Sequence, residues 1–126
     1  MATKISDLSV GDWVRVINQF DAQIDGYHRE SGSLSLKTRQ RHLVHYRLED
    51  IRPIPITPEI LEANGWKCIE EDADAAFYGD PTSSLFHTKG TFRYNFATPE
   101  VSVVCHSIHQ LQHALRLAGV EKEINL

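Results

Sequence analysis

The sequence predicts an α+β protein, with a small β-barrel in residues 1–55 and an α+β unit in residues 56–126, where an antiparallel sheet packs against a C-terminal helix. Three observations predict this organisation. Short runs of alternating apolar and polar residues, typical of strands, fill the N-terminal part. Prolines at positions 53 and 55 exclude a central strand and favour an extended connector. An amphipathic stripe of helical period leads up to Gly119.

The N-terminal part contains three strand-like runs. In the first, Val14 and Val16 share one face. The second spans residues 34–37 and the third spans residues 42–48. Three residues of the third run are expected to face the core: Val44, Tyr46 and Leu48. Three short antiparallel strands are too few for a large sandwich but enough for a small, strongly bent barrel.

A short helix is expected after the connector. Thr57 is a good N-cap, Pro58 suits the first helical position, and Asn64-Gly65 ends the pattern. Residues 66–70, WKCIE, are typical of a strand, whereas residues 71–84 have mostly the Asp, Gly, Pro and Ser content of a loop.

The next segment predicts a hairpin and a further strand. The hairpin is expected to turn at Lys89-Gly90, and its second arm carries three alternating aromatic residues: Phe92, Tyr94 and Phe96. We interpret these aromatics as core residues that the last helix covers. The run VSVVCHS, residues 101–107, is mostly apolar and is expected to form a central strand.

The last helix is expected to begin after Ser107 and to end at Gly119. Its apolar stripe, Ile108, Leu111 and Leu115, should pack on the aromatic strand. In this arrangement the imidazoles of the helix face solvent.

Composition limits the compartment and the chemistry. Neither Cys68 nor Cys105 belongs to a CxxC pair, and both lie in apolar, strand-like contexts, so neither a disulfide nor a cysteine zinc site is expected. No apolar run approaches the length that crosses a bilayer. The first residues, MATKISDLSVGDW, lack the apolar region of a signal peptide, so a cytoplasmic protein is expected. We also expect no cofactor.

Positive charge is concentrated in one predicted hairpin. Residues 1–57 carry eight Lys/Arg against seven Asp/Glu, whereas residues 58–126 carry five against ten. Hairpin 37–47 contains no acid, and its basic side chains are Lys37, Arg39, Arg41, His42, His45 and Arg47. We expect this hairpin to bind nucleic acid or a protein partner, and a solvated charged hairpin is the alternative.

The last helix carries the second candidate surface. His109 and His113 are four residues apart, the spacing with which helices hold zinc, but Gln110 stands where the HExxH motif has its glutamate. The alternative is a solvated or hydrogen-bonded pair. Gln110 and Gln112 flank the apolar stripe and either line a partner interface or face solvent.

Signatures of enzymes are missing from the sequence. It contains no nucleophile elbow, no phosphate-binding loop and no dinucleotide fingerprint, and the acidic run 70–74 lacks the calcium-loop pattern. A non-enzymatic binding protein is therefore expected. A metal-dependent or acid/base hydrolase that uses the face of His109 and His113 is the alternative.

Two segments carry a resemblance to a family. LEDIRPIPITPEILEANGWK resembles the RPIPLT…GF segment, and SIHQLQHALRLAGVEKEI resembles the HQLQ…ALTGKEL ending, of small uncharacterised proteins of prophages and mobile elements in anaerobic gut bacteria. The N-terminal part is similar to an SH3-like barrel. The resemblance implies an accessory protein that engages a host or phage macromolecule. His113 departs from the family, which usually has Asn there.

Overall fold

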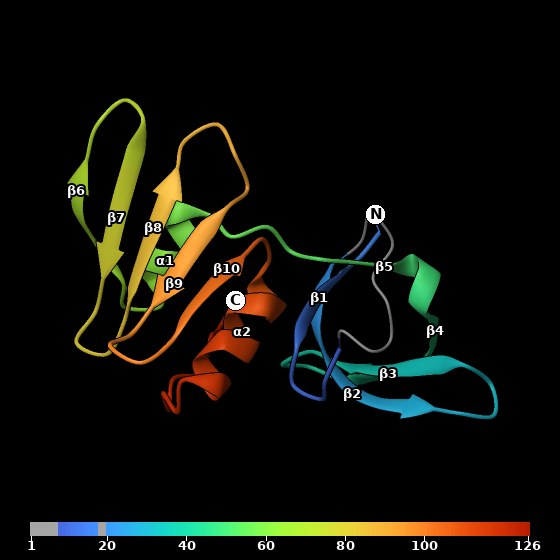
Figure 1. The fold of residues 1–126 in the computed structure, drawn as a ribbon. Helices are drawn as coiled ribbons and strands as arrows, with labels where there is room; N and C mark the ends of the chain where they lie inside the picture. Colours follow the sequence, from blue (N-terminus) through green and yellow to red (C-terminus); the bar gives the residue numbers. More distant parts are fainter. Residues whose placement is uncertain (1–7, 18–19) are drawn as a thin grey trace. The chain divides into compact units, whose positions relative to one another are not determined.

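The computed structural model of the chain describes residues 8–17 and 20–126. The chain divides into two compact units, Met1–Ile54 and Pro55–Leu126, and each contains one five-stranded antiparallel sheet (Figure 1). Two antiparallel sheets and a C-terminal helix make the fold mixed α+β, as the sequence predicts. No helix in the described residues combines the length and apolarity required to cross a membrane.

The first unit is an antiparallel meander whose last strand returns beside its first. Its elements are β1 (Trp13–Val16), β2 (Asp21–His28), β3 (Ser33–Lys37), β4 (His42–Arg47), the 3₁₀ turn η2 (Leu48–Asp50) and β5 (Ile51–Arg52). The strand order is β4-β3-β2-β1-β5. Its core is formed by Val14, Val16, Ala22, Ile24, Leu34, Leu36 and Ile51. Among the described residues no pairing joins the edge strands β4 and β5, so the sheet does not close into the predicted barrel.

The face of β4 that meets the core differs from the prediction. Leu43 and Tyr46 pack against the core, whereas Val44 is exposed. Leu34 pairs with Tyr46 and Leu36 pairs with Leu43, so β4 has one more residue than β3 between these pairs. Such a bulge interrupts the two-residue alternation of a strand. The predicted core face is therefore wrong at Val44, and its other two members do pack against the core.

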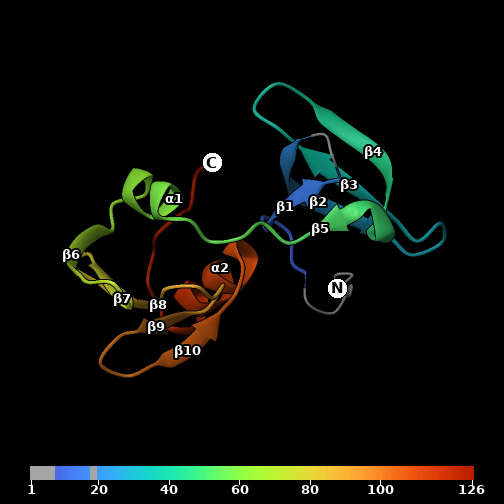
Figure 2. The same ribbon diagram turned by 90° about the horizontal axis from the view of Figure 1, so that it is seen from above.

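The second unit is a five-stranded meander, preceded in the sequence by one helix and followed by another. Its elements are α1 (Pro58–Ala63), β6 (Lys67–Glu71), β7 (Ala75–Gly79), β8 (Ser84–Thr88), β9 (Tyr94–Ala97), β10 (Ser102–Cys105) and α2 (Ile108–Leu117). The strand order is β10-β9-β8-β7-β6. Figure 2 shows both helices over the same face of this sheet. The buried residues of that face and of α2 include Ala76, Tyr78, Leu85, Tyr94, Phe96, Cys105, Ile108, His109, Leu111, Ala114 and Leu115.

Local signals set the helix ends. Thr57 Oγ1 accepts a hydrogen bond from the Ile60 N–H at 3.2 Å, and Pro58 is the first residue of α1, as predicted. Gly119 follows α2 with a φ of 73°, in the left-handed region that glycine adopts without strain. Ser107 precedes α2 in extended conformation, but its hydroxyl group does not cap a backbone N–H of the helix.

Three predictions for the second sheet are wrong. Strand β7 lies within the segment predicted to be mostly loop. Strand β10 is an edge strand and not a central one, because β9 is its one partner in the sheet. Phe92 is 72% exposed, because β9 begins only at Tyr94 and the residues before it belong to the turn. Its two alternating partners are buried as predicted.

The two cysteines lie in different environments. Cys105 is buried on β10, and burial raises the pKa of its thiol to about 12. Cys68 is exposed on the edge strand β6, so the prediction that it behaves as a buried small hydrophobe is wrong. Both cysteines are free thiols.

This difference predicts a single reactive thiol. In the folded protein at mildly alkaline pH we expect a disulfide reagent such as DTNB to titrate one thiol per chain, because Cys68 is exposed, whereas Cys105 is buried and burial raises the pKa of its thiol. Denaturant should expose the second thiol. Cys68→Ser should abolish the fast reaction and Cys105→Ser should leave it intact. Rapid reaction of two thiols in the native state would contradict the burial of Cys105.

Candidate functional site

The hairpin of β3 and β4 holds its turn in a defined shape. The Thr38 N–H donates to the Arg41 carbonyl oxygen at 2.9 Å. The Thr38 hydroxyl oxygen accepts the N–H groups of Gln40 and Arg41, each at 3.3 Å. These bonds occupy the backbone of the turn, and the side chains of Arg39 and Arg41 are exposed. The turn therefore presents two guanidinium groups to solvent.

The charges of this hairpin are only partly balanced. His42 Nδ1 lies 3.1 Å from a carboxylate oxygen of Asp25, and the guanidinium of Arg47 lies 3.7 Å from Glu49. Among the described residues neither Arg39 nor Arg41 has an ion-pair partner. Because exposed ion pairs are weak, the hairpin keeps a positive field that an anionic partner can use.

The hairpin offers no aromatic platform. The Tyr46 ring packs against the core of the first unit and meets the Phe20 ring at right angles, with 6.1 Å between the ring centroids. His45 also lies on β4, and its side chain is outside the part of the structure that is described. The described geometry therefore favours contacts with phosphate groups over base stacking.

The candidate residues of α2 lie in the second unit, and one of them differs from the prediction. His109 is only 4% exposed, and its Nδ1 lies 3.1 Å from the Ser107 hydroxyl oxygen. A β-bridge between Pro55 and Ser107 places the connector beside the first turn of α2. The predicted solvent-facing position of His109 is therefore wrong.

The remaining residues of this group are more exposed. His113 and Gln112 are half-buried, and the rings of His109 and His113 meet edge to face with 5.8 Å between their centroids. Gln110 is exposed, and its Oε1 accepts the His106 N–H at 2.7 Å, which caps the start of the helix. Within residues 8–17 and 20–126, no group of three His, Cys, Asp or Glu side chains could hold a metal ion.

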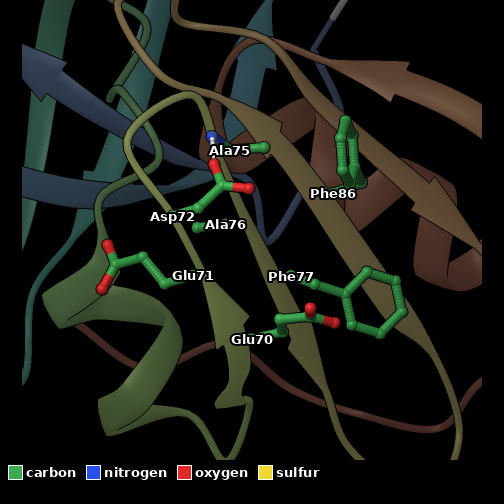
Figure 3. Close-up of a pocket in the computed structure, with 7 residues that line it drawn as sticks. All are labelled: Glu70, Glu71, Asp72, Ala75, Ala76, Phe77 and Phe86. Carbon is green, nitrogen blue, oxygen red and sulfur yellow. Dashed lines mark hydrogen bonds between the residues drawn. The ribbon is translucent and has the colours of Figure 1, made fainter.

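A surface that the sequence did not reveal lies on the side of the second sheet away from both helices. Phe77 on β7 pairs directly with Phe86 on β8, and both rings are partly exposed. Figure 3 shows the Phe77 ring beside Glu70 and the Phe86 ring farther away. These residues line a shallow hollow of about 250 Å³. The alternation AAFYG in residues 75–79 is the signal that could have found this surface, but the loop-like composition around it concealed the strand.

Comparisons of the chain with models of protein families, with curated proteins and with solved structures find no match.

Proposed function

We propose that the protein is a non-enzymatic binding protein whose β3–β4 hairpin contacts the phosphate backbone of a nucleic acid. The observation that carries this proposal is the exposure of Arg39 and Arg41 at a hydrogen-bonded turn, without an acidic partner among the described residues. Arginine side chains form bidentate, charge-assisted hydrogen bonds with phosphate. A rigid turn lowers the entropy that is lost when two such groups are positioned together.

The scaffold and origin of the protein are part of the same proposal. The strand order β4-β3-β2-β1-β5, with a 3₁₀ turn before the last strand, supports an SH3-like arrangement of the first unit. The resemblance of the RPIPIT and HQLQ segments supports an accessory protein encoded by a phage or another mobile element. A protein with few phosphate contacts and no aromatic platform binds weakly and with little sequence preference, with a Kd of about 10⁻⁴–10⁻⁶ M at physiological salt.

A titration of a fluorescent oligonucleotide tests the proposal. We expect affinity to fall with salt, and Arg39→Ala with Arg41→Ala to weaken binding about tenfold or more and to reduce the salt slope by about two. The matched control is Arg29→Ala with Arg93→Ala, which removes the same charge from two exposed positions outside the hairpin. Binding that is independent of salt, or an equal loss in the two double variants, would contradict the assignment to the hairpin.

A further inference from the structure

One row of residues crosses the whole outer face of the second sheet. Here the outer face is the side of this sheet away from α1 and α2, as Figure 2 shows. The strand register aligns the row as Glu70, Phe77, Phe86, Asn95 and Val104, one residue from each strand. Phe77, Phe86 and Val104 are between 37% and 41% exposed. Three of the five residues in the row are apolar, and the two phenylalanines are direct cross-strand neighbours, which is more than a single exposed hydrophobic side chain on an ordinary surface.

The outer face is hollowed beside the row. Next to it lies a parallel row of small residues, in which Gly79 pairs with Ser84 and Ser84 pairs with Ala97. Exposed Ile69 lies over Gly79, since a Cβ at that glycine would be 2.6 Å from Ile69 Cδ1. A second hollow, of about 400 Å³, is lined by these residues and by two turns. The outer face is therefore ridged along the phenylalanines and hollowed on both sides of Phe77.

A polar atom in this row lacks a partner. Asn95 lies between Phe86 and Val104 in the register, and its Oδ1 is buried with no hydrogen-bond partner in the described chain. Buried polar atoms in native proteins almost always have a partner, so an exception calls for an explanation. This atom has almost no solvent-accessible surface, so a docked molecule could donate to it only after the neighbouring side chains had moved.

Negative charge borders one end of the row. Glu70 lies beside Phe77, and Asp72 follows at the end of β6 (Figure 3). Asp74 belongs to the same turn between β6 and β7. Backbone N–H groups of Asp74 and Ala75 donate to Asp72 and lower the pKa of its carboxyl group, so this group is ionised at neutral pH. Glu71 is paired with Lys89 at 2.8 Å, but no cation pairs with the other three carboxylates among the described residues. A partner that covers the phenylalanines must therefore tolerate or neutralise negative charge, which disfavours nucleic acid.

We propose that the outer face of the second sheet docks an amphipathic helix of a partner protein, with aliphatic side chains on Phe77 and Phe86 and lysine or arginine side chains at Glu70 and Asp72. Five strands span about 19 Å, which matches about 13 residues of helix. The opposite face of the same sheet already packs against a helix, α2, through an apolar stripe. The proposal concerns the second unit and is independent of the hairpin that binds nucleic acid.

Two synthetic peptides test the docking surface. One is a 14-residue amphipathic helix of leucine and lysine, and the other has the same leucines with glutamate in place of lysine. In calorimetric titrations of the full chain we expect micromolar affinity for the lysine peptide and at least tenfold weaker binding of the glutamate peptide. Phe77→Thr with Phe86→Thr should weaken binding of the lysine peptide at least tenfold, since threonine keeps the strand propensity but removes the rings. The control Phe92→Thr removes an exposed ring outside the row and should leave binding unchanged.

Reversal of one surface charge distinguishes specific docking from non-specific binding, and it leaves the packing of the sheet unchanged. Glu70→Lys should weaken binding of the lysine peptide and strengthen binding of the glutamate peptide. The control Glu62→Lys, at an exposed position of α1 over the opposite face of the sheet, should change neither affinity. Equal affinities of the two peptides, or unchanged binding in both Phe77→Thr with Phe86→Thr and Glu70→Lys, would overturn the proposal.

Two other molecules could cover the outer face, a second copy of the chain or a nucleic acid, and each predicts a different experimental result. Sedimentation velocity that shows a dimer of the chain, dissociated by Phe77→Thr with Phe86→Thr, would make a second copy the occupant and overturn the proposal. Oligonucleotide binding that is lost in this double variant, but kept when Arg39 and Arg41 are replaced, would assign the face to nucleic acid and also overturn it. Monomeric protein and unchanged oligonucleotide binding agree with the proposal.

Discussion

Replacement of Trp66 by alanine is expected to lower the free energy of unfolding of the second unit by about 3–5 kcal/mol. The Trp66 side chain is fully buried, and its Nε1–H donates to the Ser83 hydroxyl oxygen at 3.1 Å. The ammonium group of Lys122 lies 4.6 Å from the centroid of its ring. Alanine therefore opens a large cavity, leaves the Ser83 hydroxyl without its donor and removes a cation–π contact.

Denaturant unfolding, followed by circular dichroism and by fluorescence, measures this effect. The chain has two tryptophans, and Trp13 remains as a probe of the first unit when Trp66 is replaced. Trp66→Phe retains most of the apolar volume and is expected to cost about 1–2 kcal/mol. The control Phe92→Ala removes a largely exposed aromatic ring from the same unit and should change stability by less than about 0.5 kcal/mol. A loss below about 1 kcal/mol in Trp66→Ala would contradict the packing described here.

Elements with a local chemical signal were predictable from the sequence. The Thr57 hydroxyl, the ring of Pro58 and the left-handed conformation of Gly119 act within one helical turn of the helix end that they define. Gly90, with a φ of 85°, terminates β8 at the predicted hairpin turn for the same reason. The stripe of α2 was equally predictable, because its helical period needs no knowledge of the sheet that it covers.

The errors arise where the structure depends on residues distant in sequence. The extra residue of β4 exists only in relation to β3, so alternation within β4 alone could not show that Val44 leaves the core. An apolar run likewise does not indicate whether its strand lies at the centre or at the edge of a sheet, and β10 lies at the edge. Of its apolar side chains, Cys105 is buried and Val104 lies on the outer face.

The same distinction separates the candidate surfaces. Exposure of Arg39 and Arg41 follows from charge and turn composition, both of which are visible in the sequence. The periodicity of the helix does not encode the burial of His109, and Ser107, which precedes the helix, pairs with Pro55, more than fifty positions away. The row on the outer face of the second sheet requires the register of five strands, which single-strand patterns do not contain.

The second large effect is expected at Asp80, which joins the C-terminal segment to the sheet. Its Oδ1 accepts hydrogen bonds from the N–H groups of Thr82 and Ser83, each at 2.8 Å, and from the Thr82 hydroxyl at 2.7 Å. Its Oδ2 lies 3.0 Å from the ammonium group of Lys122, and its side chain is 3% exposed. Burial alone would raise the pKa of Asp80, but the hydrogen bonds from Thr82 and Lys122 outweigh burial and hold it at about 2.

A pKa below the unfolded value of 3.8 makes the carboxylate stabilising at every pH above that value. The gap between the two pKa values corresponds to about 2 kcal/mol, which is lost as the pH falls from about 4 through about 2. At neutral pH, Asp80→Asn is expected to cost about 2–3 kcal/mol, because the amide cannot pair with Lys122 and one of its groups is a donor. The unfolding free energy of this variant should also fall less steeply with decreasing pH, because it lacks the carboxylate that becomes protonated.

Urea unfolding of both proteins across the acid range tests both statements. The difference in unfolding free energy between the native sequence and Asp80→Asn should be largest near neutrality and should shrink by about 2 kcal/mol as the pH approaches 2. Asp72→Asn is the matched control. Asp72 is exposed and accepts two backbone N–H groups, which an asparagine carbonyl can also accept, so the loss of unfolding free energy should stay below about 1 kcal/mol.

Lys122→Met combined with Asp80→Asn should lower the unfolding free energy by less than the sum of the single changes, because the two side chains share one interaction. A difference between the native sequence and Asp80→Asn that stays constant from neutral pH to pH 2 would show that the charge of Asp80 does not stabilise the second unit.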